Sequence, residues 1–425
     1  MENKAQGTIW NGPVQFKLPD SDYAGIAANV SFFDHMKLSD KEPNASRPAD
    51  PSVRWKSVGT DWKRPVWTPV PDGKGILLNE GWKVAVCPPA DYTESSMDTE
   101  EWQEVMVPAE LMALGYDIRR DKEYVYKRQL DIPKEWQGST LILKFGMVYE
   151  YCKIWVNGKF VREHEGAFTS FECDITNYVI FGQAAIITVM CMHRHDALCD
   201  WTAEPGTEAP GYAGLIDDVT LAVLPGMHLK RMIYDTELDD AYANAVLKVT
   251  AELAQAPGTE NGQQISAKLR LMDPQSRNIL SENCRLYFED GFAKLELAVA
   301  NPLKWCAEHP NLYRLEVILQ SENDMPLVYS LNVGFRKAER IGKELYVNGR
   351  KTKLRGAALY AHDPIRGKVF VREELEATVK AAKWANINFF RSSAYPERAY
   401  LYELCDRYGL FVEECAPANF RRESS

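Results

Sequence analysis

Apolar and polar positions along the chain predict three successive regions of regular structure, of which the first is all-β. Between about residues 76 and 225 the apolar positions alternate with polar ones or form short runs, as in YVYKRQLDI, STLILKFG and CKIWVNGKFV. Such alternation is typical of strands with one buried face. The pair Asn157-Gly158 between two runs predicts a tight hairpin, since both positions tolerate positive φ. Several short strands at this spacing predict a β-sandwich or jelly roll.

The second region, residues 226 to about 338, repeats the β pattern. It contains the alternating segments HLKRMIYDTEL, NAVLKVTAELA, QISAKLRLMD and YRLEVILQ. Their number and length predict a second β-sandwich of immunoglobulin-like size.

The third region, residues 339–425, changes to a mixed pattern. In REELEATVKAAKWAN the apolar residues Leu375, Val379 and Ala382 recur at three- and four-residue spacing, which predicts a helix. INFFRSS is typical of a buried strand, ERAYLYELCDRYG predicts a second helix that ends at Gly409, and LFVEEC predicts another strand. Strands that alternate with helices predict the opening of a parallel α/β unit.

Residues 1–75 show weak periodicity and many Pro, Asp, Ser and Lys. We interpret them as an irregular arm that wraps a neighbouring domain, with Trp55, Trp62 and Trp67 as anchors. Partial disorder is the alternative, and so many tryptophans argue against it.

Composition excludes several classes of protein. The formal net charge is −10 and the Lys and Arg residues are scattered, so we expect no nucleic-acid partner. Nine Cys without a CxxC pair indicate reduced thiols. No segment approaches 18 apolar residues and the N-terminus has no apolar signal core, so we expect no membrane contact and a cytoplasmic protein.

One cluster of polar residues could be taken for a metal site. His193, His195, Asp196 and Asp200 are close in sequence, but their spacing is not that of ligands on one helix face and no third partner is evident. A polar loop is the favoured interpretation, and we predict no metal and no cofactor.

Several segments, in order along the chain, resemble family-2 glycoside hydrolases. They are FGMVYEYCKIWVNGKFVREHEGAFTSFECDIT, NPLKWCAEHPNLYRLEV, VGFRK, LYVNGRKTKLRG, NINFFRSSAYP and LYELCDRYGLFVEE. The resemblance runs from about residue 76 to 420. It implies a jelly-roll sugar-binding domain over 76–225, an immunoglobulin-like sandwich over 226–338 and the first (βα)2β part of a TIM barrel over 339–425.

The same resemblance implies a retaining β-glycosidase of the β-galactosidase and β-glucuronidase kind. In such enzymes two Glu, an acid/base and a nucleophile, lie about 5–5.5 Å apart at the ends of barrel strands 4 and 7. A barrel needs about 250 residues, and the pattern reaches only the third strand before Ser425. We therefore expect both catalytic Glu beyond this chain, no catalytic residue within it, and no activity from it alone.

Residues that follow the barrel strands are the candidates for substrate binding, since barrel active sites form at the carboxyl ends of the strands. The candidates are Arg391, Tyr360, His362, Asp363 and Tyr395. Each has a plainer alternative: a surface loop for His362 and Asp363, and packing at the barrel end for the two tyrosines. His164 and Glu165 lie in a family motif whose Gly-Phe turn is structural, so a packing role is expected there too.

Arg391 has two interpretations of equal weight. It either orients active-site carboxylates or pairs structurally with Glu413 or Glu414. These two Glu are adjacent on a strand and must point to opposite faces, so they cannot flank one glycosidic bond. We expect Glu414 to have a structural role or to hold other residues of the site in place without contacting the substrate.

The chain departs from the family pattern at four positions. Ala358 replaces an Asn, Tyr360 and Ala394 replace His residues, and Asp217 replaces an Arg. Where such a side chain would bind a sugar hydroxyl, its loss costs about 1–3 kcal/mol. A divergent specificity is therefore expected.

Two functions of different classes remain open. One is a β-glycosidase whose catalytic half lies outside this chain, and the other is a non-catalytic carbohydrate-binding or scaffold protein. In both, the expected ligand is a carbohydrate, a β-glycoside. The unfinished barrel would expose apolar area, so we expect a homo-oligomer, a separate barrel-bearing partner chain, or a truncated product of limited stability.

Overall fold

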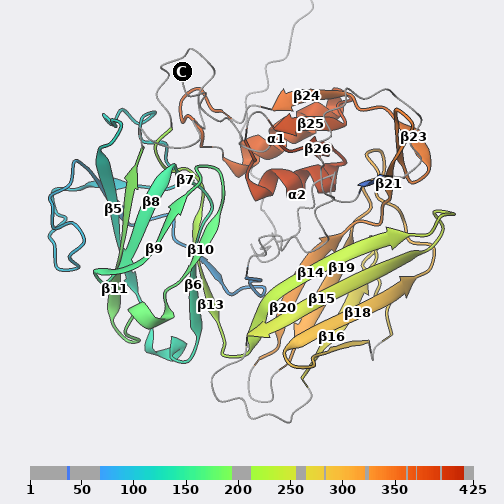
Figure 1. Cartoon of the computed structure of the whole chain (residues 1–425), viewed down its shortest axis with the longest axis horizontal. Helices are drawn as coiled ribbons and strands as arrows, with labels where there is room; N and C mark the ends of the chain where they lie inside the picture. The colour runs from blue at the N-terminus through green and yellow to red at the C-terminus, as the bar shows by residue number, and fades with distance from the viewer. Residues whose placement is uncertain are drawn as a thin grey trace, which may run out of the picture.

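The computed structural model describes most of the chain from residue 68 onward. The described residues are 68–193, 212–254, 265–281, 284–320, 325–359, 362–369, 371–392 and 395–415, together with the backbone of strand β1 (Met36–Leu38). The three anchor tryptophans of the expected arm lie outside them. Figure 1 shows two β-sandwiches and a small α/β unit that lies above the second one.

The first β-sandwich packs two sheets over one apolar core. Its six-stranded sheet has the order β4 (Gln103–Val105), β3 (Trp82–Val86), β5 (Glu123–Asp131), β11 (Ala184–Met192), β8 (Tyr151–Val156) and β9 (Lys159–Glu165). The facing sheet has the order β10 (Phe171–Asp174), β6 (Thr140–Phe145), β13 (Val219–Leu224) and β2 (Gly75–Leu77). A short pair, β7 (Val148–Tyr149) with β12 (Gly214–Leu215), lies beside them. The described part of this domain also contains the 3-10 turns η2 (Lys134–Trp136) and η3 (Thr176–Tyr178).

Alternation of side chains builds this core as the sequence predicts. In β8, Cys152, Ile154 and Val156 are buried in the core, while Lys153 and Trp155 between them are half-buried and lie on the other face of the strand. Asn157 and Gly158, at φ +51° and +75°, close the hairpin to β9. The predicted two-residue turn is confirmed.

The second β-sandwich has three strands against four. One sheet has the order β14 (His228–Leu238), β15 (Ala245–Ala254) and β18 (Phe292–Val299). The other has the order β17 (Arg285–Tyr287), β16 (Ser266–Met272), β19 (Tyr313–Leu319) and β20 (Leu327–Val333). Every second residue of β15 from Ala245 to Leu253 is buried in the core between the sheets, which is the period-two pattern of an amphipathic strand.

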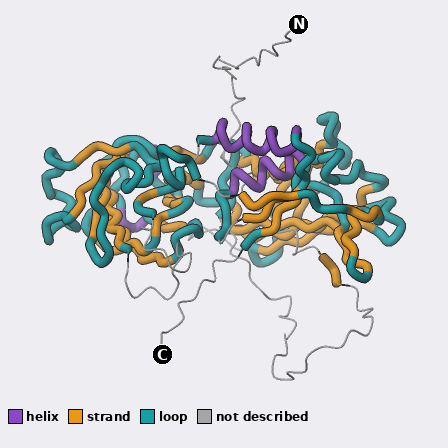
Figure 2. Tube along the Cα trace, turned by 90° about the horizontal axis from the view of Figure 1, so that it is seen from above, coloured by secondary structure: helices purple, strands orange, loops and turns teal. Residues whose placement is uncertain are grey.

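A small sheet leads from this domain to the α/β unit. It consists of β1, β21 (Ala338–Ile341), β22 (Glu344–Val347) and β23 (Arg350–Thr352). The α/β unit then follows the order β24 (Gly356–Leu359), α1 (Arg372–Trp384), β25 (Phe389–Ser392), α2 (Ala399–Tyr408) and β26 (Phe411–Glu413). Its three strands are parallel, and Figure 2 shows both helices on one side of them. The predicted (βα)2β fragment is confirmed.

The helices cover one face of the three-stranded sheet. Leu375 and Val379 of α1 and Leu404 of α2 are fully buried against Phe390 of β25, as the helical spacing predicts. On the other face, Phe411 packs against Trp305 of the second sandwich. The fold class, mainly β with a jelly roll, an immunoglobulin-like sandwich and the start of a TIM barrel, is confirmed.

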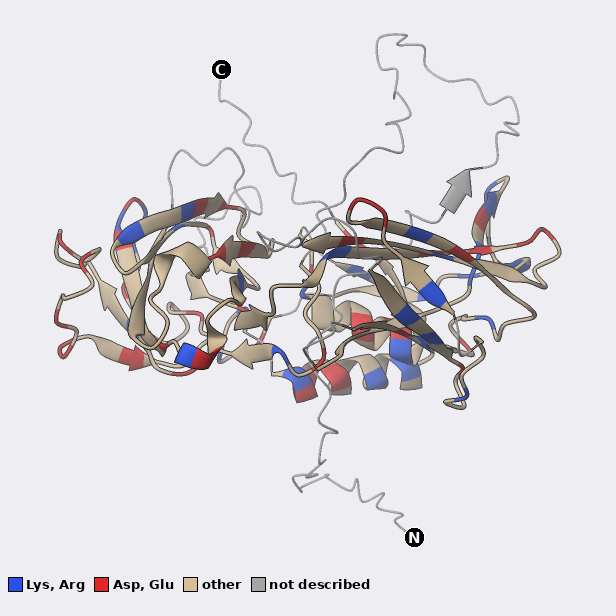
Figure 3. Cartoon of the chain, turned by 90° about the horizontal axis from the view of Figure 1, so that it is seen from below, with Lys and Arg blue, Asp and Glu red and all other residues tan. Residues whose placement is uncertain are grey.

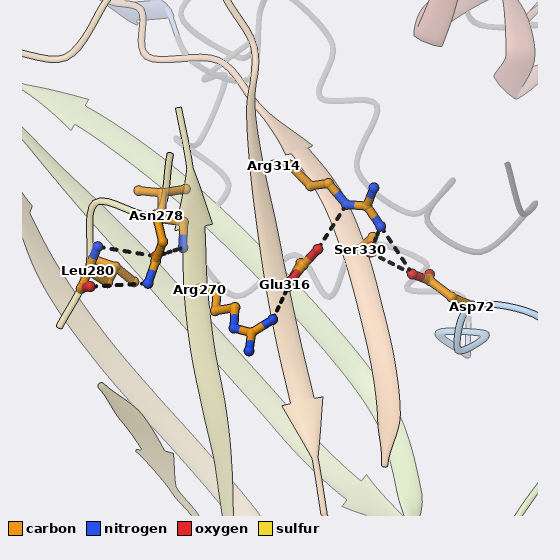
Figure 4. Close-up of polar contacts among 8 residues, drawn as sticks. Asp72, Arg270, Asn278, Leu280, Arg314, Glu316 and Ser330 are labelled. Atoms are coloured by element: carbon orange, nitrogen blue, oxygen red, sulfur yellow. Dashed lines mark hydrogen bonds and ion pairs between the residues drawn. The ribbon is translucent and has the colours of Figure 1, made fainter. Parts of the chain in front are cut away.

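The segment just before β2 ties the first sandwich to the second. Asp72 accepts a hydrogen bond from Ser330 Oγ at 2.7 Å (Figure 4). Its backbone N–H donates to Val328 O at 2.8 Å. Arg314, also paired with Glu316, lies 3.4 Å from the same carboxylate. Charged residues of both signs are interspersed over the described surface (Figure 3). Among the described helices, none has the length and apolar character that crossing a membrane requires.

Candidate functional site

The carboxyl ends of β24, β25 and β26 meet at one edge of the sheet, because the three strands are parallel. Barrel enzymes build their active sites at this edge. The candidates His362, Tyr395 and Glu414 follow the three strands in turn, and Arg391 lies within the middle one. Tyr360 lies outside the described residues.

Arg391 is exposed and contacts two side chains of the neighbouring strand end. It is the register partner of Glu413, and its Nε lies 3.5 Å from Glu413 Oε1 and 3.5 Å from Cys415 Sγ. The guanidinium side chain is 58% accessible. Its pKa is raised, first by the contact with Cys415 and then by Glu413. The structural ion pair with Glu413 is therefore present, and the guanidinium stays open to a ligand; its role toward substrate stays a prediction.

Glu413 and Glu414 point to opposite faces of β26. Glu413 is turned toward Arg391, whereas Glu414 Oε1 accepts a hydrogen bond of 2.5 Å from Tyr402 of helix α2. Burial raises the pKa of Tyr402, so that its hydroxyl remains a donor. The same hydroxyl accepts the backbone N–H of Glu397 at 2.9 Å. Glu414 thus stabilises the position of helix α2 through Tyr402, and Tyr402 in turn contacts the segment after β25. These contacts lie on the face of β26 opposite to that of Glu413.

Asp363 holds a turn together. Its Oδ1 accepts the backbone N–H groups of Ile365 and Arg366 at 2.8 and 2.7 Å, and Arg366 Nη2 lies 3.1 Å from Oδ2. These backbone hydrogen bonds, that of Arg366 first, lower the pKa of Asp363. His362 beside it lies with its ring 5.9 Å from that of Tyr212. The carboxylate of Asp363 is occupied by the turn, and a substrate role for either residue stays a prediction.

Tyr395 is packed against the first sandwich. Only 5% of it is accessible. Phe168, from the loop between β9 and β10, stacks on its ring with centroids 3.9 Å apart, and Lys368 Nζ lies 4.2 Å from the ring centroid. One ring face is thus covered by the turn whose packing role the sequence predicts, and stacking of Tyr395 on a sugar stays a prediction.

Three charged residues beside Tyr395 were missed by the sequence reasoning. Lys368 and Glu397 form a buried ion pair at 3.2 Å, and Arg398 Nη1 lies 3.7 Å from Asp217 Oδ1. Nothing in their local sequence pattern distinguishes these residues from solvated loop residues. The one signal was Asp217, because it places a carboxylate where the family pattern has Arg. Such an exchange predicts that a cation lies elsewhere in the chain.

The polar cluster before Trp201 is only partly described. His193 is buried with Nε2 3.7 Å from Glu150 Oε2, whereas His195, Asp196 and Asp200 lie outside the described residues. Within the described part of the chain, no three His, Cys, Asp or Glu side chains come together as metal ligands.

Comparison with known proteins matches each of the three structural units to a family model. Residues 76–225 match the family model for the sugar binding domain of glycosyl hydrolases family 2. Residues 227–336 match a second model of glycosyl hydrolases family 2, and residues 340–421 match the model of its TIM barrel domain. The three matches follow one another in the order of the three structural units.

Curated relatives are similar over most of this chain. A beta-galactosidase of Halalkalibacterium halodurans is 26% identical over 365 residues, which are 79% of this chain and 35% of the relative. A beta-galactosidase of Vibrio vulnificus is 28% identical over 373 residues, or 80% of this chain and 35% of the relative. The chain thus spans about a third of the length of these relatives.

Solved structures show the same fold. The chain superposes on Bacteroides uniformis beta-glucuronidase 2 with a TM-score of 0.71 at 22% identity, covering 81% of this chain and 42% of that one. For a beta-glycosidase from Bacteroides vulgatus the TM-score is 0.70 at 22% identity, covering 81% and 44%. From its three consecutive family matches, the chain belongs to glycosyl hydrolases family 2.

Proposed function

We propose that this chain forms the two β-domains and the first part of the barrel of a β-glycosidase that acts on a β-galactoside or a β-glucuronide. The observation that carries the proposal is the set of β24, β25 and β26, whose common edge presents the open guanidinium of Arg391. Arg391 would orient a carboxylate of the active site or of the substrate. The names of the relatives support the substrate class.

The catalytic carboxylates would come from barrel strands outside residues 1–425. Retaining hydrolysis needs two carboxyl groups about 5–5.5 Å apart that face one bond. Glu413 and Glu414 face opposite ways, and each has a partner already, Arg391 and Tyr402. Asp363 is engaged by its own turn. We therefore infer that Arg391 and its neighbours form one wall of a site that other strands complete.

The surface of α1 supports a further α/β unit as the partner that completes the barrel. Trp384, 95% accessible, continues an exposed stripe with Ala377 and Ala381 at helical spacing. The adjacent edge strand β24 exposes Gly356, Ala357 and Ala358. A parallel strand beside β24 with a helix on this stripe would cover both. Such a unit would come from the same polypeptide, from a separate barrel-bearing chain or from a second copy.

We also propose a cytoplasmic location. All eight Cys that the structure describes are free thiols, and four of them are buried. Free thiols in this number suit a reducing compartment.

One observation favours the alternative, a carbohydrate-binding or scaffold protein without catalysis. By resemblance, Ala358 and Ala394 take positions where the family has sugar-contacting residues, and Tyr395 between β25 and α2 is packed under Phe168. A site that has lost such contacts would bind sugar without the hydrogen bonds that catalysis uses.

The experiment that separates the two is to determine whether the coding region continues into further barrel strands, and to assay the longest product. A continuation with an Asn-Glu strand end and a later nucleophile strand, giving a protein that hydrolyses an aryl β-galactoside or β-glucuronide, supports the enzyme. A longest product that binds these sugars and leaves them intact supports the alternative.

A further inference from the structure

The segment Tyr395–Arg398, between β25 and α2, is held by residues of the jelly-roll domain and by a neighbouring loop of its own barrel fragment. Its four residues are described and three of them are buried: Tyr395, Glu397 and Arg398. Their contacts come from the loop at Phe168, from the residues between β12 and β13, and from the loop that precedes α1. The first two of these belong to the jelly-roll domain.

The centre of this contact is the ion pair between Lys368 and Glu397. The two side chains are 1% and 2% accessible and lie 3.2 Å apart. Lys368 Nζ also lies 4.2 Å from the ring centroid of Tyr395 and 5.6 Å from that of Phe168. Burial lowers the pKa of Lys368, and the charge of Glu397 opposes that shift. Loss of one partner would leave the other buried without the opposite charge that lies beside it, which is strongly destabilising.

Arg398 extends the contact to the jelly-roll backbone. Its Nη2 donates to Ile216 O at 3.4 Å and to Lys368 O at 3.2 Å, and Nη1 lies 3.7 Å from Asp217 Oδ1. Asp217 is one of the four residues that depart from the family pattern, and Arg398 is its compensating cation. Burial raises the pKa of Asp217, and Arg398 is the main influence that opposes this shift. At the start of α1, Arg372 lies 3.4 Å from Asp218 of the same jelly-roll segment.

We propose that these residues form an interdomain latch, through which the jelly roll rather than the remaining barrel strands fixes the segment Tyr395–Arg398. The latch consists of Phe168 and Asp217 on the jelly roll and of Lys368, Tyr395, Glu397 and Arg398 on the barrel fragment. It fixes the start of helix α2, because α2 begins at the next residue, Ala399. The strand edge that carries Arg391 therefore takes its conformation without any further barrel strand.

The test is amide hydrogen exchange of the full 425-residue chain, read by mass spectrometry on peptides from α2, the loop around Phe168, β6 and β15. In the wild type, α2 should exchange as slowly as the core strand β6. Lys368→Met should accelerate exchange in α2 and around Phe168 by at least about a hundredfold, and leave β6 and β15 unchanged. The matched control is Lys351→Met, which breaks the exposed pair with Glu344 between β22 and β23 and should leave α2 as in the wild type.

Two results would overturn the latch. One is an α2 that exchanges fast already in the wild type, and the other is equal acceleration of all four peptides, or of none, in Lys368→Met. If Lys368→Met does not fold, Phe168→Leu removes the ring stack without leaving a buried charge. It should accelerate α2 selectively by about tenfold, and an unchanged α2 in that variant would contradict the proposal.

Discussion

The indole Nε1 of Trp305 in the immunoglobulin-like domain donates a hydrogen bond of 2.7 Å to the backbone carbonyl of Asp406 in helix α2. The indole is fully buried and meets the ring of Phe411 edge-on at 5.4 Å. Ala307 lies two residues after Trp305, and its backbone oxygen accepts a hydrogen bond of 2.9 Å from Lys383 Nζ of helix α1. The barrel fragment is therefore docked on the second β-sandwich as well as on the first.

This docking predicts different consequences for two tryptophans. Trp305→Phe should lower the free energy of unfolding by about 2 kcal/mol, because it removes a buried hydrogen bond and part of a buried ring. Trp384→Phe, the matched control on the exposed end of α1, should change it by less than about 0.5 kcal/mol. Urea unfolding followed by circular dichroism measures both, and equal effects would contradict the docking.

Gly409 closes helix α2 where no side chain fits. Its φ is +77°, and an added Cβ would lie 2.3 Å from the backbone oxygen of Ala307. Gly409→Ala should cost more than about 2 kcal/mol, since the strain of a positive φ adds to a clash with backbone. Gly342 has a similar φ of +64°, but a Cβ added there would meet no atom within 4 Å. Gly342→Ala should therefore cost about 1 kcal/mol. Thermal melts that rank the two variants equally would refute the close approach.

Arg391 should matter little for stability. Its ion pair with Glu413 is largely exposed at 3.5 Å, and such pairs contribute less than about 1 kcal/mol. Arg391→Ala should therefore melt within a few degrees of the wild type. A large loss of stability in that variant would mean that the guanidinium is a structural element rather than an open group at the strand edge.

Two histidines should lose their contribution to stability on mild acidification. Burial lowers the pKa of His228 and of His164 below the ordinary value of 6.5. A histidine of this kind holds fewer protons folded than unfolded, so its contribution to stability is complete above pH 6.5 and is lost as the pH falls toward the folded pKa. His228 lies 2.7 Å from Pro225 O through Nδ1.

The variant His228→Gln should weaken this pH dependence. Glutamine cannot titrate, and its amide can still donate toward the Pro225 carbonyl. Unfolding free energies measured between pH 7.5 and 5.5 should fall less steeply in His228→Gln than in the wild type. A slope that is unchanged would assign the acid sensitivity to other groups.

Local sequence signals predicted the parts of the fold that depend on neighbours in the chain. The Asn157-Gly158 turn, the buried stripe of Leu375 and Val379, and the stop of α2 at Gly409 all follow from backbone preference or periodicity. Adjacency on a strand likewise separated Glu413 from Glu414.

The candidate site depends on contacts between residues far apart in sequence, and these were not predictable. Lys368 and Glu397 are residue types typical of solvated loops, yet both are buried, with Lys368 close to Phe168 of the jelly roll. Tyr395 is covered by Phe168, which lies more than two hundred positions earlier. For Asp363 a local signal existed, since Asp at the start of a turn commonly accepts the next backbone N–H groups. Because Asp363 follows a barrel strand, it was interpreted as a substrate-binding candidate instead.

The most direct test of the central claim is hydrolysis of aryl β-galactoside, β-glucuronide, β-mannoside and β-glucoside by the purified 425-residue chain. We predict release of the aryl alcohol at the rate of buffer alone for all four, because no two carboxylates of the described strand edge face a common bond. Turnover above buffer that is abolished by Arg391→Ala would contradict the account, and would show that carboxylates within this chain complete a catalytic site.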